Sequence, residues 1–95
     1  MIKVVTERHC KPGSEEELKK LMELLRGAAL QRNGSYAFET LRSMDNPSVW
    51  LAIASWSISE EWKAWRDSPE RQEIIRRIEL LLTEPATESA FEFVR

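Results

Sequence analysis

The sequence has very few of the side chains from which metal sites and most catalytic centres are built. Its 95 residues include one cysteine, Cys10, and one histidine, His9. One cysteine cannot form an internal disulfide, and this pair cannot supply the usual ligands of a zinc site. The chain also has no GxGxxG motif, no Walker loop and no Ser/His/Asp set. We therefore expect no metal and no cofactor.

Neither sign of charge dominates, and long apolar runs are missing. The chain has 14 basic and 16 acidic residues, so its net charge of −2 creates no basic surface for nucleic acid. No apolar run approaches the roughly 18 residues that a membrane span needs. Charges interrupt the short apolar run at the start, which fits neither a signal peptide nor a transit peptide. We expect a soluble, cytoplasmic protein that binds neither nucleic acid nor a membrane.

The aromatic residues that the chain does have are unevenly placed. All four tryptophans lie between residues 50 and 65, in a stretch that begins as a strand and ends in an amphipathic helix. A chain of this length makes one domain, and we assign residues 1–95 to it. The segments on either side are expected to complete one small core around the tryptophans.

Apolar spacing predicts both strands and helices. Two-residue alternation predicts four strands, at residues 1–10, 35–43, 48–56 and 88–94. Three- and four-residue spacing predicts a first helix over 14–30, with Ser14 and Glu17 forming a capping box. A second helix is expected in two pieces, at 60–66 and from Ser68 to about Leu82, with Ser68 as the cap and Pro69 at the first position.

The order β-α-β-β-α-β predicts a ferredoxin-like α+β sandwich with a four-stranded antiparallel sheet. The first and third strands should be central, and the helices should cover one face. The third strand is apolar on both faces, which carry Val49, Leu51 and Ile53 on one side and Trp50, Ala52, Ala54 and Trp56 on the other. One apolar sheet face is therefore left without a cover. We expect a homodimer that buries this face against a second copy.

Three segments together resemble the antibiotic biosynthesis monooxygenase family of dimeric α+β barrel proteins. They are KPGSEEEL, GSYAFETLRSMDNPSVWLAIASW and WSISEEWKAWRDSPERQEI. The resemblance implies a homodimer whose sheets pack face to face, with a small-molecule pocket between each sheet and its helices. Some members of this family oxidise aromatic polyketides or quinols with molecular oxygen and without metal or flavin, and others bind and degrade haem.

The haem-degrading branch is the poorer match. Its members carry a histidine about three turns beyond the tryptophan-containing segment, where this chain has Ile74, Ile75 and Arg76. We therefore do not expect haem. The favoured interpretation is a cofactor-independent monooxygenase for an aromatic or quinol-type substrate, with molecular oxygen as co-substrate. The alternative is a non-catalytic small-molecule-binding or stress-response dimer on the same fold.

Four aromatic residues are candidates for the substrate pocket. Trp62 and Trp65 are three residues apart on a short helix and should point together toward the sheet. They serve either as core residues or as a pocket wall. Trp56, at the end of the third strand, and Phe38, on the second, complete the candidate set.

Two pairs of polar residues are candidates for catalysis. Glu7 and His9 share a face of the first strand, where a carboxylate that orients an imidazole makes a general base. Tyr36 and Arg42 share a face of the second strand and can orient a substrate hydroxyl or enolate. The plainer interpretations are a solvated strand end for the first pair and an exposed edge strand for the second.

Overall fold

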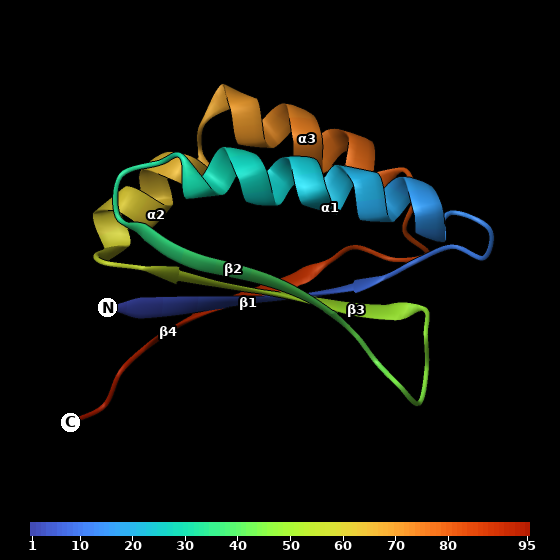
Figure 1. Ribbon diagram of the computed structural model, residues 1–95, viewed down its shortest axis with the longest axis horizontal. Helices are drawn as coiled ribbons and strands as arrows, with labels where there is room; N and C mark the ends of the chain where they lie inside the picture. Colours follow the sequence, from blue (N-terminus) through green and yellow to red (C-terminus); the bar gives the residue numbers. More distant parts are fainter.

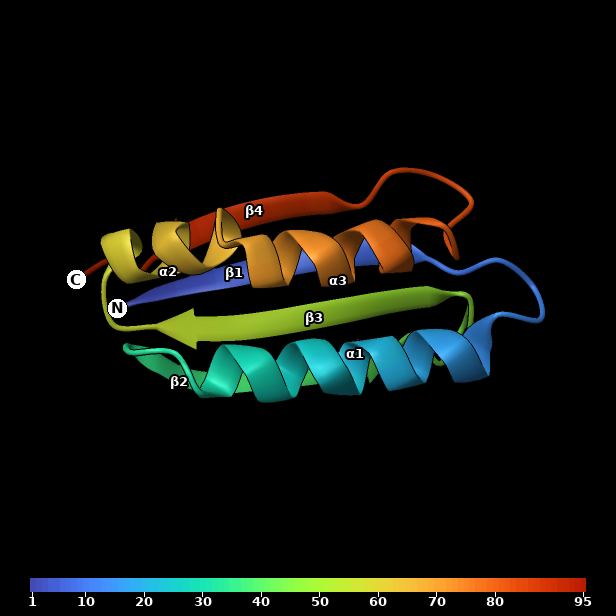
Figure 2. The same ribbon diagram turned by 90° about the horizontal axis from the view of Figure 1, so that it is seen from above.

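The computed structural model describes residues 1–95 and has two layers, a four-stranded sheet and a layer of three helices (Figure 1). The strands are β1 (Ile2–His9), β2 (Ser35–Arg42), β3 (Val49–Trp56) and β4 (Thr87–Glu92). The helices are α1 (Glu15–Leu30), α2 (Ser59–Arg66) and α3 (Pro69–Glu79). All lie on one side of the sheet, with α1 over the β2 side and α2 and α3 over the β1 side (Figure 2). No helix is long and apolar enough to cross a membrane.

The sheet has the order β2-β3-β1-β4, and every neighbouring pair is antiparallel. The register places Val4 beside Ala54 on one side and Ala90 on the other. The two central strands are those that the sequence predicts, and the ferredoxin-like α+β fold is confirmed.

The core lies between the sheet and the helices. Along β1 every second residue is buried, because the side chains of a strand alternate between its two faces. The same alternation on β3 turns three of the apolar side chains of that strand and its terminal Trp56 toward the helices. The buried residues facing one another across the layers are Val4, Thr6, Arg8, Phe38, Trp50, Ala52, Ala54 and Trp56 from the sheet, and Leu18, Leu21, Met22, Leu25, Ala29, Trp65, Ile74 and Ile78 from the helices.

The opposite face of the sheet has no covering element (Figure 1). Val5, Leu51 and Ile53 are only partly buried there, although β1 and β3 are the central strands. On the edge strands, Leu41 is 45% exposed and Phe91 is 56% exposed. We call this surface the open face. Its apolar character agrees with the apolar side chains that the sequence has on both faces of β3.

Two element ends differ from the sequence-based prediction by more than one residue. Helix α3 ends at Glu79, whereas the spacing predicts a helix to about Leu82. Beyond the helix, Leu82 forms a β-bridge with Cys10, and the backbone N–H of Lys11 donates to the Leu81 carbonyl at 2.8 Å. This pairing holds the buried Leu82 against the end of β1. The last strand stops at Glu92, two residues before the expected end.

The helix starts differ in how they are capped. The predicted capping box at Ser14 is wrong, because Ser14 has ψ of 6° and its side chain makes no capping bond. A cap side chain needs an extended backbone in order to reach the helix amides. Ser68 has that conformation, with ψ of 143°, and its hydroxyl accepts from the Arg71 amide at 3.2 Å. Pro69 follows at the first position, so this start is confirmed.

We predict that Ser68→Ala lowers the free energy of unfolding by about 1 kcal/mol or somewhat more. The buried Ser68 hydroxyl also donates to the Trp65 carbonyl at 2.7 Å, so the change removes two bonds at the junction of α2 and α3. The matched control is Ser14→Ala, whose hydroxyl makes no capping bond and whose loss should cost little. Urea unfolding followed by tryptophan fluorescence, at one protein concentration, measures both. Equal losses for the two variants would contradict the assignment of the cap.

Candidate functional site

A small, partly enclosed space lies between the helices and the sheet, with a volume of about 20 Å³. That is room for about one water molecule. Its apolar lining is Val4, Leu25, Phe38, Ala52, Ala54, Trp56, Trp62 and Trp65, and its polar lining is Thr6, Arg8, Arg71 and Glu88. All four aromatic residues that the sequence suggests for a pocket therefore border one space, which we call the inner cavity.

The three indoles of the inner cavity come from two different elements. Trp65 is 3% exposed and Trp62 is half-buried, and both project from the short helix α2. Trp56 ends β3, where its indole is buried and its Nε1 donor has no hydrogen-bond partner. An unpaired buried donor is costly, so Trp56 is suited to meet an acceptor atom supplied by a ligand.

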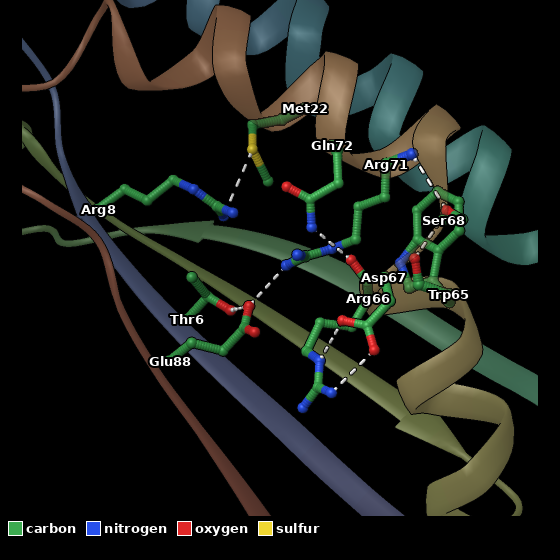
Figure 3. A network of polar contacts seen from close by, with 10 residues as sticks. All are labelled: Thr6, Arg8, Met22, Trp65, Arg66, Asp67, Ser68, Arg71, Gln72 and Glu88. Atoms are coloured by element: carbon green, nitrogen blue, oxygen red, sulfur yellow. Dashed lines mark hydrogen bonds and ion pairs between the residues drawn. The ribbon is translucent and has the colours of Figure 1, made fainter.

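The polar end of the inner cavity is held together by Glu88 of β4 (Figure 3). The hydroxyl of Thr6 donates to Glu88 Oε2 at 2.9 Å, and Arg71 Nη2 lies 2.7 Å from the same oxygen. The Arg71 side chain is 11% exposed, so this ion pair is shielded from solvent more than most surface pairs. It connects helix α3 to the edge strand of the sheet.

Arg8 is the most unusual residue of the site. It is 3% exposed, and its single side-chain hydrogen bond runs from Nη1 to the Sδ of Met22 at 3.7 Å (Figure 3). A thioether is a weak acceptor, so the guanidinium has no acceptor that matches its charge. Burial, and to a smaller extent the charge of neighbouring Arg71, lower the pKa of Arg8 to about 10, although the charges of Glu88 and Glu79 act in the opposite direction. The side chain therefore stays charged at neutral pH.

A second hollow of about 230 Å³ adjoins the inner cavity on the side of α3 and β4. It shares Thr6, Arg8, Arg71 and Glu88 with the inner cavity. The rest of its lining is Ile75, Ile78, Glu79, Pro85 and Ala86. We call it the outer hollow. The ion pair between Arg71 and Glu88 lies in the wall that the two spaces have in common.

The structure brings Glu7 and His9 together, but not at the inner cavity. His9 Nε2 lies 2.8 Å from Glu7 Oε2, and Nδ1 lies 3.1 Å from Glu84 Oε1. The hydrogen bond to Glu7 raises the pKa of His9 above its ordinary 6.5, with further support from the charge of Glu84 and partial opposition from burial. On β1 these two residues alternate with buried Arg8, so they face the other side of the sheet.

The structure does not bring Tyr36 and Arg42 together. They lie near opposite ends of β2, about 20 Å apart along the strand. Tyr36 is 63% exposed, beside a register irregularity between Ser35 and Ala37. The Arg42 guanidinium lies 5.8 Å from the ring centre of Trp50 and borders a separate groove of about 660 Å³ between α1 and β2. Neither residue lines the inner cavity.

Sequence reasoning missed the four polar residues of the inner cavity. For Arg8 and Thr6 a signal was available, because the alternation that places Val4 on the helix side of the first strand also places these two residues there. For Arg71 and Glu88 there was none, since their pairing joins residues 17 positions apart on a helix and an edge strand. No group of three or more His, Cys, Asp or Glu side chains lies close enough to hold a metal ion.

Comparisons with known proteins agree on one family. Residues 1–77 match the sequence model of the family described as antibiotic biosynthesis monooxygenase. Protein SchA of Streptomyces halstedii is 26% identical over 78 residues, which are 82% of this chain and 20% of SchA. The chain thus spans about a fifth of the length of this curated relative.

Solved structures show the same fold at low sequence identity. SnoaB, a cofactor-independent oxygenase from Streptomyces nogalater, superposes with a TM-score of 0.90 at 16% identity, over 99% of this chain and 93% of its own. Another structure, of an antibiotic biosynthesis monooxygenase, gives a TM-score of 0.91 at 16% identity over the full length of both chains.

We predict that the pKa of His9 lies above 6.5 and falls when Glu7 is replaced by glutamine. His9 is the only histidine, so its ring signals are easy to follow in an NMR titration. A raised folded-state pKa means that the pairing stabilises the fold below the unfolded value and that this contribution is lost as pH rises through the folded value. Glu7→Gln should therefore destabilise the protein just below pH 6.5 more than in alkaline solution. A pKa at or below 6.5 in the unaltered protein would refute the prediction.

Proposed function

Because this chain belongs to the antibiotic biosynthesis monooxygenase family, we propose that it is a cofactor-independent monooxygenase that oxidises an aromatic or quinol-type small molecule with molecular oxygen. The observation that carries the proposal is the inner cavity, whose lining combines three indoles with a buried guanidinium. Flat apolar walls suit an aromatic ring, and a buried cation suits the negative oxygen of its ionised form.

The reaction that these residues suit needs no electrons from outside the substrate. A phenol that loses its hydroxyl proton becomes electron-rich enough to react with molecular oxygen. One oxygen atom forms a new C=O bond on the ring, the other leaves as water, and the phenol oxygen becomes the second carbonyl. The ring loses two hydrogen atoms from the carbon that is oxidised and from the hydroxyl, so atoms and electrons balance without a cofactor.

Each side chain has a role in this proposal. The positive charge of Arg8 favours the phenolate over the phenol, because burial strengthens the attraction between opposite charges. Glu88 is the one carboxylate on the lining, so it accepts the phenol proton as the ring enters, before it turns toward solvent. Trp62 and Trp65 hold the ring and exclude water, and the unpaired Nε1 of Trp56 donates to the new carbonyl oxygen. A role for His9 as a general base stays a prediction. His9 is turned to the open face, so it could act only on a substrate that binds there.

The inner cavity must enlarge when a ring enters, because about 20 Å³ holds no more than one water. Two parts of its wall are suited to move. Trp62 is only half-buried on α2, a helix of 8 residues that ends at the break before α3. The Arg71–Glu88 pair separates the inner cavity from the larger outer hollow. Substrate binding then selects an opened form of the same fold.

We also propose that the protein works as a homodimer, with the open faces of two copies packed against each other as in a dimeric α+β barrel. Support comes from the apolar side chains that this face leaves uncovered, which include Val5, Leu51, Ile53, Leu41 and Phe91. A two-fold arrangement covers both copies of the face with one interface. The partners of this chain are then a second copy of itself and a small aromatic molecule.

We predict that the protein sediments as a dimer at micromolar concentration, near twice the chain mass of 11.1 kDa. Leu51→Lys puts a charge at the centre of the open face and should shift the equilibrium toward monomer, because a buried unpaired charge opposes association. The control is Leu24→Lys, a half-exposed position on α1, which should leave the dimer intact. A folded species at the monomer mass without any substitution would refute the dimer.

We predict oxygen uptake when the protein is mixed with a panel of hydroquinones and naphthols, at a rate above that of the buffer. Trp62→Ala should reduce this rate about tenfold or more, because the ring loses its main half-exposed wall, while the fold changes little. The control is Ile58→Ala, an exposed residue that precedes the same helix and does not line the inner cavity. No uptake with any compound of the panel would favour the non-catalytic small-molecule-binding alternative.

A further inference from the structure

Arg8 has a charge that nothing within the chain neutralises at hydrogen-bond distance. Glu88, the one carboxylate on the lining of the inner cavity, bonds to Thr6 and Arg71 and not to Arg8. Glu79 lines the outer hollow without a hydrogen bond to Arg8. A buried guanidinium held by a thioether alone is poorly satisfied, so the protein gains if an anionic group reaches it.

The neighbours of Arg8 already show how an anionic oxygen is bound there. Oxygen Oε2 of Glu88 receives one hydrogen bond from the Thr6 hydroxyl and a charged contact from Arg71 Nη2 (Figure 3). Arg8, Thr6 and Arg71 border the same two spaces, so all three lie at the polar part of the shared wall. Glu88 occupies that region as an internal carboxylate.

Glu88 is also the member of the cluster that can leave most easily. It belongs to β4, an edge strand in which all six residues are exposed. Its side chain is 24% exposed, against 11% for Arg71. A rotation of Glu88 toward solvent keeps its charge hydrated, whereas Arg8 and Thr6 are fixed in the centre of the core. Once Glu88 leaves, the wall between the inner cavity and the outer hollow loses one of its four shared residues.

We propose that Arg8, Arg71 and Thr6 form a subsite for an anionic oxygen, a phenolate or a carboxylate, on an aromatic ligand that binds in place of the Glu88 carboxylate. The inference rests on the proposed function in one respect, because it takes the ligand to be the aromatic substrate of the same cavity. It adds the class of that substrate: an aromatic acid or a readily ionised phenol rather than a neutral ring. The anionic oxygen sits at the shared wall, and the ring extends toward the three indoles.

The direct test compares two ligands of the same shape and different charge, 2-naphthoate and 2-naphthamide, by isothermal titration calorimetry at neutral pH. We expect the unaltered protein to bind 2-naphthoate about tenfold more tightly or better, as a charge-assisted bond predicts. Arg8→Met has nearly the same volume and no charge, and it should abolish the difference between the two ligands. The control is Arg76→Met, which removes an exposed guanidinium paired with Glu73 on the outer side of α3 and should keep the difference.

Glu88→Gln tests displacement and also covers the case that Arg8→Met does not fold. Because the change removes the competing negative charge from an exposed strand, 2-naphthoate should bind several-fold more tightly and 2-naphthamide should be unaffected. Arg8→Lys keeps the positive charge and should retain part of the preference for the anion. Weaker binding of 2-naphthoate to Glu88→Gln would overturn the displacement.

A second arm separates phenolates from carboxylates. The absorption of 4-nitrophenol shifts to longer wavelength when it ionises, so the protein should increase its phenolate band in slightly acidic buffer, and Arg8→Met should not. A response in either arm that depends on Arg8 supports the subsite and tells which anion it takes. Equal affinity for 2-naphthoate and 2-naphthamide together with an unchanged nitrophenol spectrum overturns it, and so does a lack of binding at millimolar ligand.

The outcome for this subsite is separate from the outcome for the proposed function. A preference for the anion that depends on Arg8, without oxygen uptake from any hydroquinone or naphthol, keeps the subsite and removes the monooxygenase. Oxygen uptake without a preference for the anion keeps the monooxygenase and removes the subsite.

Discussion

The two-residue alternation of β1 is the constraint on which the rest of the structure depends. Because β1 is central and pairs with β3 and β4 on its two sides, its register decides what the helices meet and what they leave uncovered. Val4, Thr6 and Arg8 are turned toward the helices, so the same repeat that builds an apolar core also carries a cation into it. Val5, Glu7 and His9 are turned to the open face. A shift of one residue would exchange these two sets.

The site is unusual because the charged Arg8 is buried without a partner of opposite charge at hydrogen-bond distance. In a domain of 95 residues the core is small, and Arg8 is one of the few charged or polar side chains buried in it. Replacing a buried charge by an apolar side chain of similar volume is often neutral or stabilising for a fold. The presence of Arg8 is therefore hard to explain by stability alone, and it is better explained by an anion that the chain itself does not provide.

Sequence reasoning predicted the fold well, because the fold depends on repeating patterns that single residues do not change. The strand order, the broken second helix and the cap at Ser68 all follow from spacing and local chemistry. Two predicted details were wrong because residue spacing does not show which of two local structures forms. Leu82 pairs with Cys10 and does not continue the helix, and the backbone of Ser14 is not extended, so its side chain does not cap. The aromatic lining was foreseeable from spacing on α2, whereas the link from Arg71 to Glu88 required the packing of α3 against β4.

The position of β4 at the edge of the sheet has a consequence for local opening of the fold. It pairs with β1 alone, and none of its six residues is buried. In a single copy of the chain, a strand with no buried residue detaches in partial openings that cost less than global unfolding, and the proposed dimer makes these openings rarer because it covers Phe91. Glu88 departs with it, so the polar end of the site becomes exposed while the tryptophans and α1 stay folded. Amide hydrogen exchange in β4 and ligand entry then report on the same local opening. The rate of this opening limits how often a ligand can reach the inner cavity.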